Sequence, residues 1–310
     1  MFQTLCVVGG GTMGVDIAAS FAAHNWATVI VNPLDERSAS IPERFQLALA
    51  RMEATAQQPM SWVNTLSEVD WPSVDLVIEA IPEKLELKQS LFRDLESRAR
   101  PDIPLCSNSS ALPISAIGQG LKSQHRMLGT HYFMPAHLVP GVEVVCSVHT
   151  DPKVADQVAT MMSSVGKVPI RVKQDLPGFL VNRLQHAVSR EALKLIDRGI
   201  ATPEDIDAAV RFGFGFRYLA AGPCLQRDHA GLDIHLAAGA SIYPDLCNDA
   251  EPSEILKTRV AEGATGMKAG RGFYDWTPEG MAAERKRYED LLTSASRLLA
   301  EEIKAQTPGI

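Results

Sequence analysis

A glycine-rich turn near the amino terminus limits the possible folds of this chain more than any other feature. Residues 9–14 read Gly-Gly-Gly-Thr-Met-Gly, directly after an apolar β-branched run at residues 4–8 and before a helical pattern. Gly9 permits a tight turn, Gly11 lets the backbone approach a pyrophosphate, and Gly14 allows the helix to pack close to the strand. The segment therefore predicts the first strand, turn and helix of a dinucleotide-binding domain.

The end of the second predicted strand bears on the choice of dinucleotide. An acidic residue commonly stands there to bond the adenosine ribose hydroxyls, whereas this chain has Asn32. An amide can bond a ribose hydroxyl, but it does not repel a 2′-phosphate as a carboxylate does. No Arg or Lys follows directly, which favours NAD, and Arg37 leaves NADP open. We expect the cofactor to contact Asn32 and the turn, including Thr12 and Met13.

The first half of the chain alternates short β-branched runs with helical segments. Several runs are apolar throughout, as expected of strands in a parallel sheet covered on both faces. From Pro177 onward the strand pattern stops and helical spacing replaces it. This order predicts an α/β Rossmann-type domain at residues 1–174 and an all-α domain at residues 175–310. The predicted strands contain residues 5–8, 28–31, 76–78, 105–106, 127–129 and 142–145.

Helix signals recur in the second half. One apolar pattern predicts a helix that ends at Gly199, and residues 202–205 (Thr-Pro-Glu-Asp) combine an N-cap, a first-turn proline and an acidic residue. Thr277 precedes a predicted last helix of more than twenty residues. Its apolar stripe needs cover from its own domain or from another subunit. The stripe consists of Tyr288, Leu291, Leu292, Ala295 and Leu299.

Composition limits the kinds of partner. The chain has a net charge of -7 and no long cluster of Lys and Arg, so we expect neither nucleic acid nor an anionic membrane as a partner. We expect a small-molecule substrate instead. The five cysteines are scattered without a CxxC pair, which fits a reducing compartment and predicts no metal site. The start of the chain lacks a signal-peptide pattern and no run is long enough to span a membrane, so we expect a cytoplasmic protein.

Several separate motifs resemble the L-3-hydroxyacyl-CoA dehydrogenase superfamily over most of the chain. That family has a Rossmann-type N-terminal domain and an all-helical C-terminal domain that commonly dimerises. The resemblance therefore implies a homodimer formed through the C-terminal domain. The motifs are the glycine turn, VIEAIPE at 77–83, SNSS at 107–110, GTHYF at 129–133, VEV at 142–144, DLPGFLVNR at 175–183 and GRGFY at 270–274.

Alcohol chemistry explains why this family needs a polar set within those motifs. Oxidising a secondary alcohol requires a base for the hydroxyl proton, and imidazole suits this role, so His131 is the candidate. The resemblance gives Glu143 the task of orienting the imidazole, and makes Ser110 and Asn182 donors to the substrate oxygen. Each residue also has a structural interpretation, because His131 could be an ordinary buried histidine and Ser110 or Asn182 a helix cap.

The resemblance assigns further cofactor contacts. Glu83 and Lys88 would contact the nicotinamide ribose, and Asn108 in the SNSS motif belongs to the same cofactor site. Lys88 could instead be a solvated helix residue.

Three departures from the family pattern bear on the substrate. The lysine-rich arm that grips the nucleotide of CoA is replaced by a shorter segment, residues 33–71, with arginines only at 37, 44 and 51. Met134 stands where the family has Asn, three residues after the candidate base. Residues 213–218 (GFGFRY) are more similar to branches acting on small free acids, such as carnitine dehydrogenase and the gulonate dehydrogenase related to lambda-crystallin. There Arg217 could clamp a substrate carboxylate or form an ordinary ion pair.

These observations favour an NAD-dependent oxidoreductase that acts on the hydroxyl of a small 3-hydroxy acid or 3-hydroxyacyl thioester, with His131 as general base. One alternative is oxidation of an aromatic hydroxymethyl or aldehyde group, because residues 228–234 resemble a pyridine-carboxylate dehydrogenase branch. A non-catalytic dinucleotide-binding protein is a third possibility. The 6-phosphogluconate-type dehydrogenases also join a Rossmann domain to a helical one, but they use a catalytic lysine in the helical region. The motif with Asn182 and Arg183 fits the hydroxyacyl-CoA family better.

Overall fold

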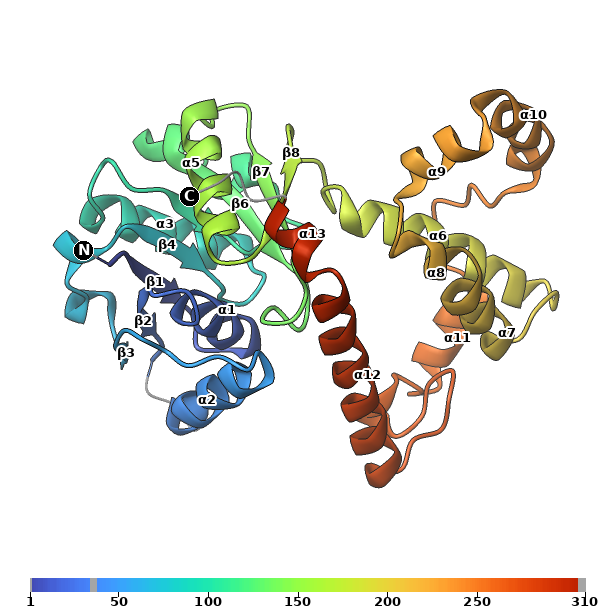
Figure 1. Cartoon of the computed structure of the whole chain (residues 1–310), viewed down its shortest axis with the longest axis horizontal. Coiled ribbons are helices and arrows are strands. Elements are labelled where there is room, and N and C mark those ends of the chain that lie inside the picture. Colours follow the sequence, from blue (N-terminus) through green and yellow to red (C-terminus); the bar gives the residue numbers. More distant parts are fainter. Residues whose placement is uncertain (1, 34–37, 306–310) are drawn as a thin grey trace. The chain divides into compact units, whose positions relative to one another are not determined.

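The structure is a computed structural model that describes residues 2–33 and 38–305 (Figure 1). The chain divides into two compact units, one comprising Met1–Asn182 with Lys286–Ile310 and the other Arg183–Arg285. We call the first the Rossmann unit and the second the helical unit. The domain boundary between residues 174 and 175 stays a prediction.

A mixed sheet forms the centre of the Rossmann unit. Its strands, among the described residues, lie in the order β3-β2-β1-β4-β5-β6-β7-β8. The first six follow the Rossmann order, so the predicted fold class is confirmed for this half of the chain. The bounds are β1 Thr4–Val8, β2 Ala27–Val31, β3 Met60–Val63, β4 Leu76–Glu79, β5 Leu105–Ser107, β6 Met127–Tyr132, β7 Gly141–Cys146 and β8 Val168–Val172.

The sheet departs from the expected all-parallel arrangement at one place. Strands β6 and β7 pair antiparallel, whereas the other neighbouring strands are parallel. Only residues 133–140 connect them, and a parallel crossover needs a dozen residues or more. The patterns also missed β3 and β8 at the two ends of the sheet, where the strand residues are mostly half-buried.

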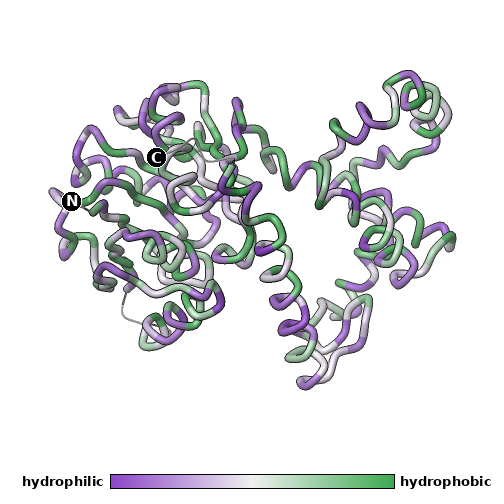
Figure 2. Tube along the Cα trace, in the orientation of Figure 1, coloured by the Kyte–Doolittle hydropathy of each residue, from purple (hydrophilic) through white to green (hydrophobic). Residues whose placement is uncertain are grey.

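Helices cover both faces of this sheet. Alternate strand residues point to opposite faces, so Val7 packs into one core while Cys6 and Val8 pack into the other. The hydrophobic stretches of Figure 2 follow these strands. Helices α1 (Thr12–Ala22), α2 (Ile41–Arg51) and α5 (Pro152–Ser164) contribute to the first core, and α3 (Leu85–Arg98) and α4 (Ile114–Ile117) to the second.

Helix ends agree with the sequence signals. Asn25 has a φ of 65° just after α1, and Gly199 has a φ of 66° after α6, as expected where a helix gives way to a left-handed residue. Thr202 caps α7 through a capping box with Asp205. The later helices are α6 Val181–Asp197, α7 Pro203–Ala208, α8 Gly215–Tyr218, α9 Pro223–Ala230, α10 Leu232–Ile242, α11 Glu254–Ala261, α12 Pro278–Leu298 and α13 Ala300–Ala305, with a π-helical segment at Ala209–Phe214.

The end of the chain differs slightly from expectation. The long helix predicted after Thr277 is α12, but α13 follows it, so α12 is not the last helix. The last residues rejoin the Rossmann unit. Glu289 forms an ion pair of 2.8 Å with Arg51, and Ser296 Oγ donates a hydrogen bond of 3.0 Å to the carbonyl oxygen of Leu138.

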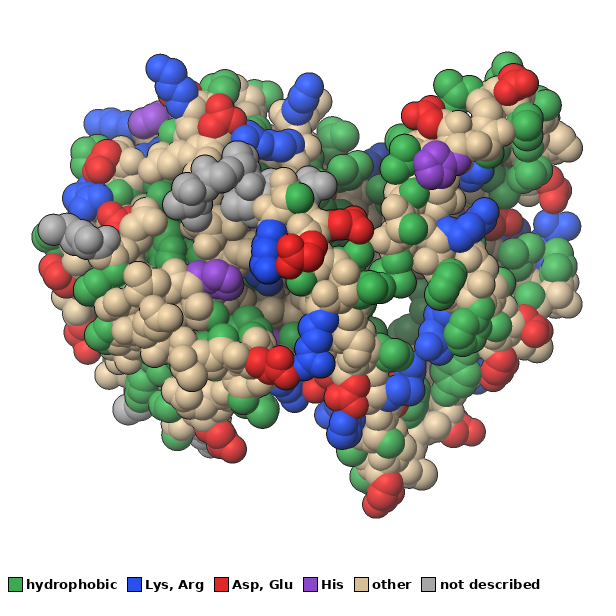
Figure 3. All heavy atoms as spheres, viewed as in Figure 1, with side chains coloured by type: hydrophobic (Ala, Val, Ile, Leu, Met, Phe, Trp, Pro, Cys, Tyr) green, Lys and Arg blue, Asp and Glu red, His purple; other side chains and the backbone are tan. Residues whose placement is uncertain are grey.

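The helical unit is all-α, as predicted, but buries almost nothing. Of its residues 183–285, all of which the structure describes, only Gly239 and Ala264 are buried. Large apolar side chains are exposed, among them Phe212, at 72%. Hydrophobic side chains are accordingly visible on its surface in Figure 3. Across the described part of the chain, no helix combines the length and the apolar character needed to cross a membrane.

Candidate active site

The glycine turn has the geometry of a cofactor cradle. Gly9 has a φ of +117°, and a Cβ atom there would lie 2.6 Å from the carbonyl oxygen of Ala80. A Cβ at Gly14 would lie 1.8 Å from the carbonyl oxygen of Gly9, so α1 starts in direct contact with the turn. A Cβ at Gly11 would meet nothing within 4 Å. This open space above the N-terminus of α1 suits a pyrophosphate, and the residues present therefore fit NAD.

Asn32 supports the turn from the end of β2. Its Oδ1 accepts a hydrogen bond of 2.9 Å from the Gly10 amide, while its Nδ2 donates to the Pro33 carbonyl at 2.9 Å and to Ser38 Oγ at 3.0 Å. The amide thus ties the glycine turn to the following segment. Its contact with the adenosine ribose stays a prediction, and Arg37, which left NADP open, lies outside the described residues.

His131 and Glu143 meet because of the antiparallel strand pair. The register of β6 and β7 places these two residues directly opposite each other, with both side chains on the same face of the sheet. His131 Nδ1 lies 2.7 Å from Glu143 Oε2. The imidazole is 3% exposed and contacts the rings of Phe133 and Phe179 edge-on. The short hairpin connection thus brings together two residues that are twelve positions apart.

The direction of these hydrogen bonds follows from the carboxylate. A carboxylate only accepts, so Nδ1 of His131 carries the hydrogen, and the neutral form of this ring has its lone pair on Nε2. Ser110 Oγ lies 3.1 Å from Nε2 and can donate to it. Asn182 Nδ2 donates a bond of 3.3 Å to the carbonyl oxygen of Ser110. The structure therefore brings Ser110, His131, Glu143 and Asn182 together within the Rossmann unit, and their roles in catalysis stay predictions.

Glu143 also holds the start of a helix. Its Oε1 accepts hydrogen bonds of 2.8 Å from the backbone amides of Leu180 and Val181, at the N-terminus of α6. Burial raises the pKa of Glu143, but the hydrogen bonds from His131 and from these two amides outweigh it and lower the pKa below its usual value. Glu143 is therefore ionised at neutral pH, as an orienting carboxylate must be.

Lys88 is buried in a polar network that the sequence patterns did not anticipate and that extends to the more exposed Glu83. Lys88 is 1% exposed, and its Nζ lies 2.5 Å from Glu79 Oε1 and 3.3 Å from Glu83 Oε2. Glu83 Oε1 accepts hydrogen bonds from Ser109 Oγ at 2.5 Å and from the Ser110 amide at 3.0 Å. Lys88 is therefore not a solvated helix residue. Glu83 fixes the segment that carries Ser110, and the ribose contacts of both residues stay predictions.

Glu79, within the motif at residues 77–83, belongs to the same network, although the family resemblance gives it no role. It is fully buried at the end of β4 and also accepts a bond of 2.6 Å from Ser107 Oγ. Burial raises the pKa of Glu79, although Lys88 and Ser107 oppose the effect. An acidic residue that closes an apolar strand was a usable signal, because a buried carboxylate needs a partner and Lys88 follows nine residues later.

The remaining predicted positions are in different places. Asn108 Oδ1 accepts a bond of 2.9 Å from the Tyr132 amide, directly after the candidate base. Met134 is 65% exposed, so it forms no part of a packed core. Arg217 lies on α8 in the helical unit. Among the described residues, no group of three or more His, Cys, Asp or Glu side chains could hold a metal ion.

Both halves of the chain match family models. The NAD-binding domain of 3-hydroxyacyl-CoA dehydrogenase matches residues 4–176, and the C-terminal domain of the same enzyme matches residues 178–276. These matches cover the glycine turn, the proposed catalytic set and most of the helical unit.

Individual relatives agree with the family models. The chain is 31% identical over 300 residues to 5-formyl-3-hydroxy-2-methylpyridine 4-carboxylate 5-dehydrogenase of Mesorhizobium japonicum, covering 93% of this chain and 96% of that protein. It is 33% identical over 292 residues to the mitochondrial hydroxyacyl-coenzyme A dehydrogenase of Sus scrofa, covering 89% and 92%. Among solved structures, an NAD+-dependent dismutase with the former activity matches with a TM-score of 0.88 and 29% identity, over 96% of this chain and 99% of that one.

Proposed function

The chain is an NAD-dependent dehydrogenase that belongs to the 3-hydroxyacyl-CoA dehydrogenase family, and on this premise we propose that it oxidises the hydroxyl of a small 3-hydroxy acid or 3-hydroxyacyl thioester with His131 as general base. The observation that carries the proposal is the hydrogen-bonded chain from Ser110 through His131 to Glu143. Nε2 of the imidazole faces the Ser110 hydroxyl, and the Glu143 carboxylate holds the opposite nitrogen.

The proposal gives each of these residues one role. Bound NAD supplies the hydride acceptor, so the alcohol carbon can lose a hydride and become a carbonyl carbon. Nε2 of His131 takes the hydroxyl proton, and Glu143 stabilises the imidazolium that results. Ser110 and Asn182 donate hydrogen bonds to the oxygen as it gains alkoxide character. In the reverse direction the same imidazolium returns the proton.

Replacing the base tests the proposal. His131→Gln keeps a polar side chain of similar size but cannot accept and return a proton, so we expect kcat to fall about a hundredfold or more. NADH binding, followed by fluorescence, should stay near the wild-type value. Initial rates are measured with NAD and a panel of hydroxy acids and their thioesters. His125→Gln, at an exposed histidine, is the matched control, and near-normal turnover by His131→Gln would refute the assignment.

A second candidate function is supported by one specific similarity. The pyridine-carboxylate dehydrogenase of Mesorhizobium japonicum and the solved structure with that activity both cover more than nine-tenths of this chain. The alternative substrate is therefore a hydroxymethyl or aldehyde group on a pyridine carboxylate. The same base serves both reactions, because an aldehyde hydrate carries a hydroxyl on the carbon that loses hydride. Adding such compounds to the substrate panel separates the two candidates.

For assembly we propose a homodimer formed through the C-terminal helical domain. Its support is the helical unit, whose own helices leave large apolar side chains exposed. Apolar surface is rarely left exposed to this extent unless a partner covers it. A cytoplasmic location is the remaining part of the proposal, and fractionation of cells would test it.

A further inference from the structure

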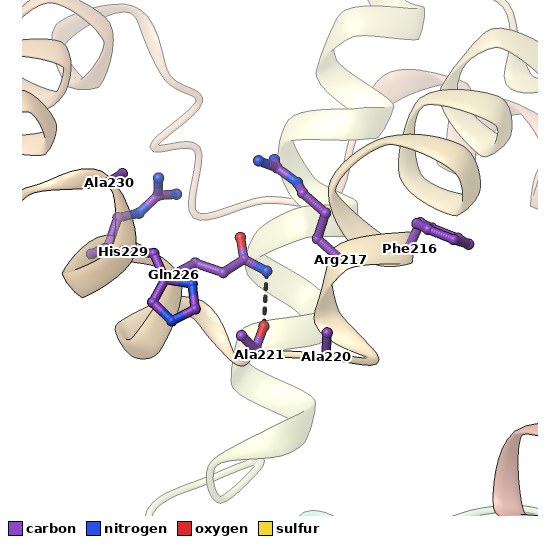
Figure 4. A pocket seen from close by; sticks show the side chains of 8 residues that line it. Phe216, Arg217, Ala220, Ala221, Gln226, His229 and Ala230 are labelled. Carbon is purple, nitrogen blue, oxygen red and sulfur yellow. Dashed lines mark hydrogen bonds between the residues drawn. The ribbon is translucent and has the colours of Figure 1, made fainter. Parts of the chain in front are cut away.

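The helical unit contains a cavity of about 500 Å³ between α8 and α9. This volume lies within the range of small-molecule sites. Figure 4 shows Arg217 reaching from α8 toward the α9 side of the cavity, where Gln226 and His229 lie. Apolar side chains form much of the remaining wall, namely those of Phe216, Ala220, Ala221 and Ala230.

The charges around this cavity are unbalanced. Arg217 and Arg227 both line it, and none of the eight lining residues is acidic. Among the described residues, neither guanidinium has a hydrogen bond or an ion pair. Most other arginines of the helical unit do have such partners, for example Arg198 with Asp245 and Arg271 with the Glu262 carbonyl. Two unpaired cations beside one cavity repel each other, and a bound anion removes this cost.

Gln226 adds a hydrogen-bond acceptor to the cavity, whereas the two arginines are donors. Its Nε2 donates a hydrogen bond of 2.8 Å to the Ala221 carbonyl, which fixes the orientation of the amide. A carbonyl can only accept, so the free end of the Gln226 amide is the oxygen. The cavity therefore offers cations for an anionic group, apolar walls for a carbon body and one acceptor for a hydroxyl or N–H of the ligand.

We propose that this cavity is a binding site for a small organic carboxylate, with Arg217 and Arg227 holding the carboxylate group. Guanidinium binds carboxylates through paired hydrogen bonds, and the apolar walls suit a single ring or a short aliphatic chain. Binding of a carboxylate at this cavity does not depend on the proposed function. The proposed function enters only in deciding whether the carboxylate belongs to the substrate or to a separate metabolite.

Calorimetric titration of the full chain with benzoate tests the site, with NAD present. Benzoate combines one ring with one carboxylate, and benzamide is its neutral counterpart. We expect benzoate to bind more tightly than benzamide, and Arg217→Gln and Arg227→Gln each to weaken benzoate at least tenfold. Arg211→Gln is the matched control, because Arg211 lies in the same unit over the Phe212 ring and does not line the cavity. Thermal unfolding checks that every variant is folded.

Three results would overturn the proposal. The first is equal benzoate affinity in wild type and in the double variant. The second is binding of inorganic phosphate or CoA in place of benzoate. The third is a change of oligomeric state in light scattering without a change in benzoate affinity, which would mean that the arginines meet a second copy of the chain.

Steady-state kinetics identifies the source of the carboxylate. If the carboxylate belongs to the substrate, the double variant lowers the ratio of kcat/KM for the free acid to that for its thioester at least tenfold. An unchanged ratio with lost benzoate binding assigns the site to a separate acid. Benzoate binding is measured without turnover, so absence of benzoate binding would not affect the test of His131 as the base. Conversely, an active His131→Gln enzyme would not change the result of the benzoate titration.

Discussion

The two units of this protein differ in how many of their apolar and charged side chains they bury. The Rossmann unit buries apolar residues on both faces of its sheet and also buries charged ones, including Glu79, Lys88 and Glu143. The helical unit has charged and apolar side chains alike on its surface, and only Gly239 and Ala264 are buried. Buried charges need partners at fixed distances, so the first unit can hold a reaction geometry.

The proposed proton-transfer groups and the proposed ligand site lie in different units. The hydrogen bonds of His131, Glu143 and Ser110 all lie within the Rossmann unit, where His131 and Glu143 are buried and Ser110 is exposed. The helical unit instead offers an open cavity with two unpaired arginines and a large apolar surface. The first arrangement suits proton transfer, and the second suits recognition of a ligand or of another subunit.

The largest effect is expected at the glycine turn. Gly14→Ala places a Cβ 1.8 Å from the Gly9 carbonyl oxygen, so the helix and the turn cannot both keep their positions. We expect a loss of about 4 kcal/mol or more in the free energy of unfolding, measured by urea denaturation. Gly11→Ala meets no atom within 4 Å and should fold normally, but bind NADH at least tenfold more weakly because the methyl group occupies the cofactor space. Normal NADH binding by Gly11→Ala would contradict the prediction that the cofactor occupies the space next to Gly11.

Paired phenylalanine substitutions compare the units directly. Phe92 is fully buried in the Rossmann unit, so Phe92→Ala should lower the free energy of unfolding by about 3–5 kcal/mol. Phe212 is 72% exposed, and Phe212→Ala should change it by less than about 0.5 kcal/mol. Both are measured by denaturant unfolding at several protein concentrations. A large, concentration-dependent loss at Phe212 would break the comparison and place that residue in a subunit interface.

A buried lysine gives the Rossmann unit a pH dependence. Lys167 donates to the carbonyl oxygens of Ala136 and Val139, and burial lowers its pKa to about 8, with partial opposition from Asp16. Between pH 8 and 10.5 the unfolded chain therefore binds more protons at this group than the folded one. Its contribution to stability rises with pH across that interval, by up to about 3 kcal/mol.

Comparison with a variant isolates this contribution. Lys167→Met removes the titrating group, so the difference in unfolding free energy between wild type and variant should grow in favour of the wild type from pH 8 to pH 10.5. Cysteines and tyrosines also titrate in this pH range, but they are the same in both proteins, so their contributions cancel when the two unfolding free energies are subtracted. Parallel pH curves for the two proteins would show that Lys167 titrates normally.

The smallest effect concerns a local feature of the helical unit. Thr202 accepts a hydrogen bond of 3.2 Å from the Asp205 amide, so Thr202→Ala should cost about 1 kcal/mol in thermal unfolding. Thr160→Ala is the control in the Rossmann unit, because Thr160 lies inside α5 and bonds only the Asp156 carbonyl. Alanine favours helix interiors, so this change should be neutral or slightly stabilising. Equal losses of stability at both positions would show that the N-cap hydrogen bond of Thr202 is not the cause of the loss.

Local patterns in the sequence were enough for much of the fold. Apolar β-branched runs located six of the strands, and turn or capping residues such as Asn25, Gly199 and Thr202 located helix ends, because these conformations depend on neighbouring residues alone. The edge strands β3 and β8 were missed, since half-buried strands lack a continuous apolar run. The proposed catalytic set could be assembled from the sequence only through the family resemblance.

The order of the two halves, the cofactor turn and the reaction family can all be inferred from the amino-acid sequence. Which polar residues meet depends on the three-dimensional fold. The antiparallel register opposes His131 to Glu143, and the packing of α3 against the sheet turns Lys88 inward between two carboxylates. These contacts join residues on different strands and helices, and their distances depend on the packing of the whole sheet rather than on spacing along the chain. The open cavity beside Arg217 likewise exists only where α8 and α9 come together.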